Sequence, residues 1–309
     1  PTWAPSHADR VLRLMERDLF PWLGGTAIAD LTPPTILEVL MKIADRGAIE
    51  TAHRALTIVG QVNRFAIASG RLVSDPARDL RGALPPSIDR HFPAIVQPQE
   101  LAPLLRVLWG YQGSLAVRCA LRLAPMLAVR PGELRSAKWS DIDFDAAEWR
   151  FRLSKTRQEH VVPLARQAVE VLRELHPVTS PVSEFVFPSA RTPRRCMSDN
   201  AVLSALRRSD IPKEALVGHG FRATFRTVLD EVLGFRVELI EHQLGHAVKD
   251  SLGRSYNRTS HLPARKAMMT AWCDYLDALR TGQKFENGPQ GVVSKVPKPP
   301  YSPSSEVEP

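Results

Sequence analysis

The stretch LPPSIDRHFPAIVQP, residues 84–98, divides this sequence into two parts. It contains four prolines and no helical period, and proline removes a backbone donor and fixes φ, so neither a helix nor a central strand can run through it. The residues on either side show helical periodicity. At 309 residues the chain is long enough for two domains. We therefore predict a linker over residues 85–97 that joins two domains.

The first part is predicted to be helical throughout. Residues 6–20 carry apolar side chains at helical spacing, with arginines on another face. A second helix begins at the Pro33–Pro34 pair and a third ends near Gly70. A short fourth helix is expected at SDPARDL. These elements predict a compact four-helix domain over residues 1–84, with arginines facing outward.

The second part is predicted to be mainly α with a small antiparallel β-sheet. Two helices are expected at QELAPLLRVLWGY and SLAVRCALRLAPML, and the run EWRFRLSKTRQEHVVPL alternates like two strands around a polar turn. Helices resume at RQAVEVLRELH, at SDNAVLSALRRS, and from His219 to about residue 280. We place this domain at residues 98–284. The proline- and serine-rich tail, residues 285–309, is interpreted as disordered.

The composition is that of an ordinary soluble protein, with 44% hydrophobic and 24% charged residues. No apolar run of about 18 residues occurs and no secretory signal is visible, so we expect no membrane partner. Three cysteines lie far apart without a CxxC pair, which is typical of reduced thiols in a cytoplasmic protein. The net charge of +8 is compatible with a polyanionic partner but does not identify one.

Several residues that can act on phosphate groups follow one another along the second part. In order they are Arg130 in AVRPGEL, the hairpin lysine Lys155, His219 and Arg222 in GHGFRATFRT, His246 at the end of IEHQLGH, and Tyr256 in SLGRSYNRTSH. His219 and Arg222 are three residues apart and share one face of a helix.

Each of these residues also has an ordinary structural explanation. Arg130 could pair with Glu133 at a helix end, Lys155 could be a solvated turn residue, and Tyr256 could be a surface tyrosine. His242 and His246 have the i,i+4 spacing of zinc ligands. However, HQLGH lacks a glutamate between the histidines and the sequence offers no third ligand cluster, which argues against a metal site.

Taken together and in this order, the segments resemble the catalytic domain of the tyrosine recombinase (phage integrase) family. The family pattern is an Arg, a hairpin Lys, His-x-x-Arg, Leu-Gly-His and then a Tyr about ten residues later. The details RPGELRSAKWSDID, HVVPL, HGFRATFRT and YNR are most similar to the prophage and satellite-phage integrases. The resemblance covers about residues 1–280, since the first part resembles the helical core-binding domain of that family.

The resemblance implies a role for each candidate residue. Arg130 and Arg222 would hold the scissile phosphate, because a guanidinium presents a planar, permanently charged fork to two phosphate oxygens. His219 and His246 would add donors, and His219 would also accept the proton of the nucleophile, Tyr256. Lys155 would protonate the leaving 5′ oxygen. The product would be a 3′-phosphotyrosine link, which a 5′-hydroxyl can reverse without any cofactor or metal.

The resemblance also implies the partners. Four protomers would assemble on two double-stranded DNA attachment sites, with an excision factor or a DNA-bending host protein as further candidates. Arginines of the first domain, such as Arg13, Arg54 and Arg64, would contact phosphates, although a solvated helix face explains them equally well. A type IB topoisomerase-like relaxase and an inactive DNA-binding remnant remain alternatives.

The sequence departs from the family in two respects. Integrases of this branch carry an arm-binding domain before the core-binding domain, and this sequence lacks one; because it starts at Pro1, a truncated start is one interpretation. Many members have a Thr just before the first arginine, where this chain has Leu-Ala-Val at residues 127–129. The helix after the nucleophile, with Met268, Met269, Trp272 and Leu276, is expected to pack within its own domain rather than on a neighbour.

Overall fold

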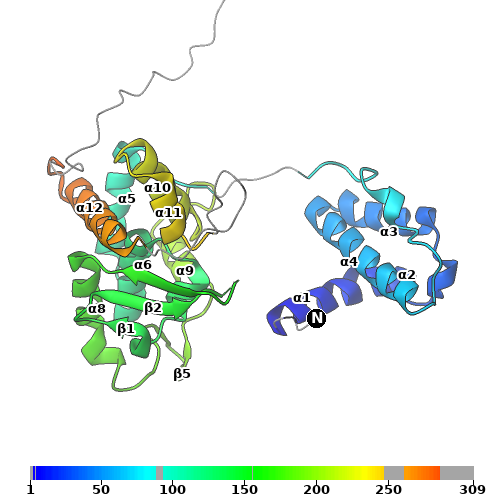
Figure 1. The fold of residues 1–309 in the computed structure, drawn as a ribbon, viewed down its shortest axis with the longest axis horizontal. Helices are drawn as coiled ribbons and strands as arrows, with labels where there is room; N and C mark the ends of the chain where they lie inside the picture. Colours follow the sequence, from blue (N-terminus) through cyan, green and yellow to red (C-terminus); the bar gives the residue numbers. More distant parts are fainter. Residues whose placement is uncertain (1–2, 4, 88–92, 155, 247–260, 286–309) are drawn as a thin grey trace, which may run out of the picture. The chain divides into compact units, whose positions relative to one another are not determined.

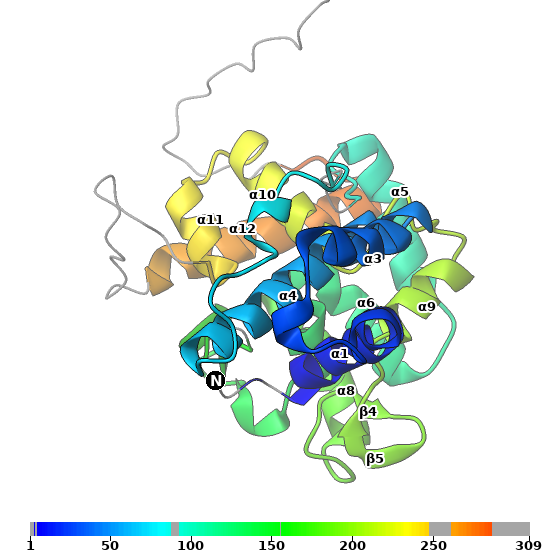
Figure 2. The same ribbon diagram turned by 90° about the vertical axis from the view of Figure 1, so that its right-hand side faces the viewer.

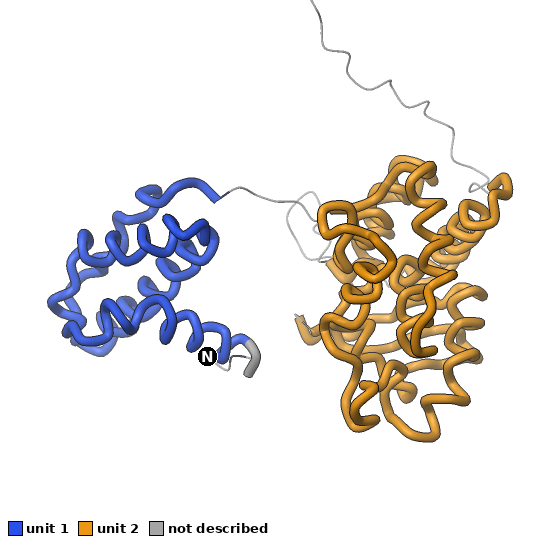
Figure 3. Tube along the Cα trace, turned by 180° about the vertical axis from the view of Figure 1, so that it is seen from behind, with its two compact units in different colours: residues 1–91 blue, residues 92–309 orange. Residues whose placement is uncertain are grey.

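The chain forms two compact units, residues 1–91 and 92–309 (Figure 3). The computed structural model describes residues 3, 5–87, 93–154, 156–246 and 261–285. The boundary between the units falls inside the proline-rich stretch. The tail beyond residue 285 lies outside the described residues.

Unit 1 is helical. Its helices are α1 (Pro5–Leu14), α2 (Phe20–Leu23), α3 (Pro33–Asp45) and α4 (Ile49–Ala68), with 3-10 turns at Ile28–Asp30 and Arg78–Leu80. Helices α3 and α4 pack side by side, and Ile36, Leu40 and Ala52 are among the fully buried residues between them. Thr32 caps α3 by accepting a hydrogen bond from the amide of Thr35 at 3.4 Å.

Two predictions for unit 1 were wrong in detail. The helix expected over residues 6–20 is interrupted by a π-helical turn, Met15–Leu19, which precedes α2. Pro21 lacks an amide hydrogen, so it cannot make the α-helical hydrogen bond to the carbonyl oxygen of residue 17. The helical hydrogen-bond pattern therefore changes just before Pro21. The fourth helix expected at SDPARDL is only the 3-10 turn Arg78–Leu80. It follows Asp75, whose carboxylate accepts from the amide of Ala77 and so favours a turn.

Unit 2 is built around helices that enclose one apolar core. They are α5 (Pro98–Gly110), α6 (Leu115–Leu127), α7 (Pro131–Arg135), α8 (Arg166–Thr179), α9 (Ala201–Arg208), α10 (Gly220–Glu231), α11 (Val237–Gln243) and α12 (Leu262–Thr281), with a 3-10 turn at Trp139–Asp141. The prediction of a mainly α fold with a small antiparallel β-sheet is confirmed.

An antiparallel sheet lies on one side of this core (Figure 1). Its strands are β1 (Ile142–Asp143), β2 (Glu148–Arg152) and β3 (Glu159–Pro163), and Trp149 pairs with Val162 in the expected hairpin. A second, two-stranded sheet of β4 (Pro188–Ser189) and β5 (Thr192–Cys196) was not predicted.

Helix α12 packs inside unit 2, against α5, α6 and β3. Met268, Met269 and Trp272 are fully buried, and the indole of Trp272 donates to the carbonyl oxygen of Pro125 at 2.9 Å. The expectation that this helix packs within its own domain is therefore confirmed. No helix within the described ranges is long and apolar enough to cross a membrane.

Candidate active site

Arg130 is positioned by a sharp reversal at the end of α6. Ala128, which ends that helix, has a left-handed backbone with φ of 49°, and residues 127–129 are buried. Two residues later Arg130 becomes the N-cap of α7, with Pro131 at the first helical position. The turn thus places the guanidinium at a helix start, at the edge of the core.

Glu133 holds Arg130 in place. This buried carboxylate accepts from the Arg130 amide at 3.2 Å and from its Nη1 at 3.1 Å. It also accepts from the amide and the hydroxyl of Ser154, at 3.4 and 3.2 Å. The pairing weighed from the sequence is thus present, and it also ties Arg130 to the end of the β2–β3 hairpin. Lys155, the next residue, lies outside the described residues.

Arg222 lies deeper, on the first turn of α10. Its Nη1 donates to the carbonyl oxygen of Ala128 and its Nη2 to that of Leu244, both at 2.8 Å. Burial, together with the charge of Arg130, lowers the pKa of the guanidinium to about 10, which still leaves it protonated at neutral pH. The side chain therefore joins three separate segments of the chain with a fixed positive charge.

His246 contacts the same guanidinium. Nη2 of Arg222 is 3.0 Å from Nε2 of His246, and Nδ1 of His246 is 2.5 Å from Oε2 of Glu241. Gly245, with φ of 67°, ends α11 and allows the chain to turn the imidazole toward Arg222. Glu241 is itself held by Nε of Arg226 at 2.8 Å.

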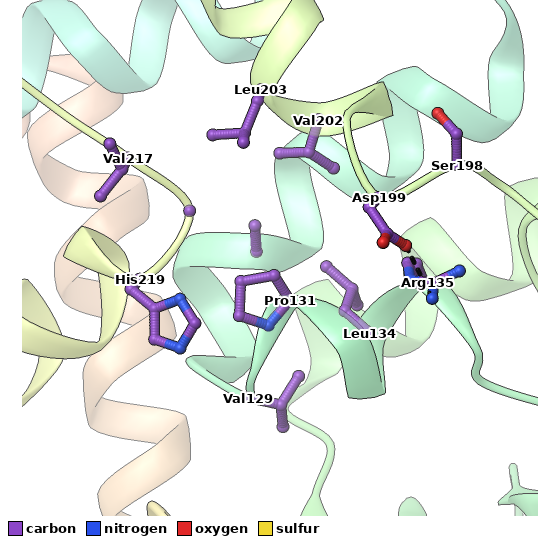
Figure 4. A pocket seen from close by; sticks show the side chains of 12 residues that line it. Val129, Pro131, Leu134, Arg135, Ser198, Asp199, Val202, Leu203, Val217 and His219 are labelled. Atoms are coloured by element: carbon purple, nitrogen blue, oxygen red, sulfur yellow. Dashed lines mark ion pairs between the residues drawn. The ribbon is translucent and has the colours of Figure 1, made fainter. Parts of the chain in front are cut away.

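His219 is the N-cap residue of α10, one turn before Arg222. Burial, and then the charges of Arg222 and Arg130, lower the pKa of its imidazole. His219 also lines a mostly apolar cavity of about 310 Å³ together with Pro131 and Leu134 of α7 (Figure 4). The structure thus brings Arg130, His219, Arg222 and His246 together. Tyr256 lies outside the described residues.

A buried polar layer supports this cluster and was not anticipated from the sequence. Arg265 of α12 donates from Nε and Nη2 to Oε1 of Gln243, at 2.9 and 2.6 Å, and from Nη2 to the carbonyl oxygen of Val161 in β3. Nε2 of His160 lies 3.1 Å from the Gln243 carbonyl oxygen. This layer fixes α11, and hence the segment leading to His246, against the sheet and α12.

Sequence signals for these supporting residues were weak. Glu133 appears only as the third residue after Arg130, and Glu241 only as a carboxylate five residues before His246. Arg265 falls on the apolar side of an amphipathic helix, where a buried arginine is unusual. That position is the one signal that could have identified it.

The zinc interpretation of His242 and His246 receives no support from their contacts. Nδ1 of His242 is 3.3 Å from Nη1 of Arg265, whereas Nε2 of His246 faces Arg222. One ring nitrogen of each histidine thus faces an arginine, which would repel a bound cation. In the part of the chain that the structure describes, no group of three or more potential ligands among His, Cys, Asp and Glu comes together.

The three arginines predicted in the first domain are all exposed. Arg13 and Arg54 line one hollow of about 590 Å³ between α1 and α4, together with Arg10 and Arg17. Arg54 also pairs with Glu50 at 3.2 Å. Arg64 lies in a different hollow of unit 1, with Arg78 and Arg81. Unit 1 thus carries two arginine-lined depressions.

Comparison with known proteins covers most of the chain. Residues 1–83 match the phage integrase central domain and residues 96–261 match the phage integrase family. The integrase of Enterobacteria phage P4 is 35% identical over 90% of this chain and 66% of its own length. Shigella phage Sf6 integrase and Escherichia coli prophage integrase IntS are each 36% identical over 89% of this chain and 71% of their own lengths. The chain thus spans about two thirds of these relatives.

Solved structures share the fold at low sequence identity. A lambda integrase dimer (residues 75–356) bound to a COC′ core site has a TM-score of 0.64 and 19% identity, over 80% of this chain and 90% of that one. The Tn1549 transposon integrase in complex with transposon right-end DNA has a TM-score of 0.62 and 14% identity, over 86% and 93%. On these matches, the chain belongs to the phage integrase family of tyrosine recombinases.

Proposed function

We propose that this chain is a site-specific DNA recombinase that cleaves and rejoins DNA through a 3′-phosphotyrosine link to Tyr256, in order to integrate or excise a mobile element. Unit 1 would be the core-type DNA-binding domain and unit 2 the catalytic domain. Family membership supports recombination, and the named relatives are phage and prophage integrases.

One observation carries the proposal. Arg130, the His219–Arg222 pair and His246 come from three separate parts of the sequence, yet they form one cluster, in which Arg130 is held by Glu133 and His246 by Glu241. A phosphodiester in displacement gains negative charge on its oxygens, and fixed donors stabilise that charge best when they are preorganised. The guanidiniums of Arg130 and Arg222 supply such donors, and the imidazoles of His219 and His246 lie beside them.

The proposed reaction needs one group that accepts a proton and one that donates a proton. The lowered pKa of His219 keeps its imidazole neutral at neutral pH, so it can accept the phenol proton of Tyr256. The phenolate oxygen then bonds to phosphorus as the bond from phosphorus to the 5′ oxygen breaks. Lys155 donates the proton that this leaving oxygen takes up. One phosphodiester is exchanged for another, so a 5′-hydroxyl can reverse the step without an external energy source.

Duplex DNA would be held by both units. The exposed Arg13, Arg54 and Arg64 of unit 1 are suited to phosphate contacts, which contribute most of the sequence-independent affinity. A solved lambda integrase is described as a tetramer bound to a Holliday junction. We propose the same assembly here, four protomers on two attachment sites, with an excision factor or a DNA-bending protein as an optional partner.

A nicked suicide duplex that carries the attachment core tests the proposal. Wild-type protein should form a covalent protein–DNA band in a denaturing gel, and Tyr256→Phe should form none. Tyr275→Phe is the matched control, because the Tyr275 hydroxyl is buried and makes no hydrogen bond within the described structure. An adduct that persists in Tyr256→Phe contradicts the assignment of the nucleophile.

A strand-transfer assay with two sites separates recombination from relaxation. A recombinase yields recombinant products from two attachment cores, whereas a type IB-like relaxase only removes supercoils. Failure of wild-type protein to form any adduct on a mapped core would instead favour the inactive DNA-binding remnant.

A further inference from the structure

The unpredicted β4–β5 hairpin, residues 188–196, concentrates positive charge on the surface of unit 2. Arg191, Arg194 and Arg195 are all exposed, and the hairpin contains no acidic residue. In Figure 2 the hairpin lies at the lower edge of the unit, away from α10, α11 and α12. None of the three arginines forms an ion pair with a described acidic side chain, whereas nearby Arg135 and Lys138 pair with Asp199 and Glu184.

The hairpin holds these arginines on a fixed backbone. Pro188 pairs with Cys196 and Ser189 with Thr192, so the residues between Thr192 and Cys196 form a bulge. The Arg194 amide donates to the Thr192 hydroxyl at 3.3 Å, and the Pro193 carbonyl oxygen accepts from the Ser183 hydroxyl at 2.7 Å. These two bonds hold the backbone of the bulge, and neither of them uses a guanidinium. Bulges of this kind commonly redirect side chains near active sites.

The base of the hairpin is attached to α7, the helix that Arg130 caps. Arg135, the last residue of α7, donates from Nη1 to Sγ of Cys196 and to the carbonyl oxygen of Met197, each at 3.1 Å. The five-residue helix α7 is about 7.5 Å long, and two strand residues from Cys196 to Arg194 add about 7 Å. The Arg135 side chain joins these two lengths. Even with its length added, the path from Arg130 to Arg194 is shorter than one turn of duplex DNA, ~34 Å.

We propose that the β4–β5 hairpin is a second DNA-contact element of unit 2, in which Arg191, Arg194 and Arg195 bind backbone phosphates within about one helical turn of the cleaved bond. The inference rests on the proposed function, which places a phosphate at Arg130. Duplex DNA fits this surface better than an acidic protein does, because guanidinium forks match phosphate oxygens and the hairpin offers no apolar anchor for a protein interface.

The test compares two triple variants that lose the same charge. One is Arg191→Gln, Arg194→Gln, Arg195→Gln in the hairpin. The control is Arg166→Gln, Lys213→Gln, Arg236→Gln, three exposed cations of unit 2 that pair with Glu170, Glu214 and Glu238. Affinity for a duplex with the mapped attachment core is measured across a salt series, and hydroxyl-radical footprints are recorded on the same DNA.

The hairpin variant should bind roughly 10–100-fold more weakly, and its slope of log Kd against log salt should fall by about 2.7, since each phosphate contact contributes about 0.9. Its footprint should lose protection on one flank of the cleavage site. Replacing the three arginines by lysine should largely restore the salt slope, because the charges return. The control should retain the wild-type slope and footprint.

The outcomes separate this proposal from the proposed function. A hairpin variant that forms the covalent adduct at saturating protein, but with weaker binding and a shorter footprint, supports both. Equal slopes and footprints for the hairpin variant and the control overturn the hairpin proposal, whether or not an adduct forms. Absence of an adduct with wild-type protein contradicts the proposed function. The comparison of DNA affinity and footprints then still tests whether the hairpin contacts DNA.

Discussion

Arg222 fixes the tautomer of His246. Nη2 of Arg222 can only donate, so Nε2 of His246, 3.0 Å away, must accept, and the ring proton of the neutral imidazole resides on Nδ1. That proton faces Oε2 of Glu241 at 2.5 Å, and Glu241 also accepts from Arg226. In the absence of DNA, His246 is thus held between a cation and a carboxylate. Glu241 thus orients the ring, and its Nε2 is directed at the Arg222 guanidinium.

Glu241→Ala should therefore slow adduct formation by roughly tenfold, or about 1.4 kcal/mol, by removing the group that orients the His246 imidazole. Glu241→Gln, which keeps an acceptor but no charge, should recover part of the rate. Single-turnover cleavage of the suicide duplex measures the effect. DNA affinity should change little in both variants, and a loss confined to affinity would contradict the positioning role.

Glu133 is expected to support both Arg130 and the turn of the β2–β3 hairpin. Glu133→Ala removes the acceptor for Arg130 and for Ser154, so the adduct yield should fall by roughly 10²-fold, comparable to loss of one preorganised donor. Ser154→Ala breaks only the hairpin contact through the hydroxyl and should cost much less. Equal rates for Glu133→Ala and wild type would show that Arg130 needs no such support.

The rate of adduct formation should depend on pH through His219. Its pKa lies below the ordinary value of about 6.5, because burial and the two arginines disfavour the imidazolium. The neutral base therefore persists as the pH falls through 6.5, and the rate should decline only at lower pH. His219→Gln should lower the rate and remove this acidic limb. The acidic limb would belong to another group if the wild-type rate already fell at a pH above 6.5 as the solution was acidified. The same would follow if His219→Gln left the limb unchanged.

The sequence predicted the elements that depend on local patterns. Period-2 alternation identified β2 and β3, and the apolar spacing of residues 262–281 identified α12. The π-helical turn was missed although its cause, Pro21, is local in sequence. The Glu133–Ser154 contact was missed because its residues meet only after folding, and the β4–β5 hairpin because its strands are short and irregularly paired. The order of the motif residues predicted a single site, and Arg130, His219, Arg222 and His246 do lie together. The roles of Lys155 and Tyr256 stay predictions, because both lie outside the described residues.

Burial of His160 should make folding stability pH-dependent. Burial, and then the charge of Arg265, lower its pKa to about 3, so the folded protein binds fewer protons than the unfolded chain between pH 3 and 6.5. Stability therefore falls as the pH drops below 6.5, and this group alone should make the free energy of unfolding about 2 kcal/mol lower at pH 5 than at pH 8. Denaturant unfolding at the two pH values checks the difference. His160→Gln keeps a donor for the Gln243 carbonyl but does not titrate, so its pH difference should be smaller by that amount.

Gly245 combines two constraints that a side chain would violate. Its φ of 67° is left-handed, and a Cβ there would lie 2.9 Å from Cδ2 of Leu153, at the start of the β2–β3 turn. Gly245→Ala should therefore destabilise unit 2 by about 1–3 kcal/mol and displace both the Leu153 turn and His246. Gly282→Ala is the matched control, since Gly282 has a similar φ of 74° but no atom within 4 Å of the added Cβ. Gly282→Ala should lower the free energy of unfolding by roughly 1 kcal/mol, from backbone strain alone. Its adduct yield should equal that of the wild type. Equal thermal stability and equal adduct yield in the two variants would mean that the contact with Leu153 does not constrain the Leu-Gly-His segment.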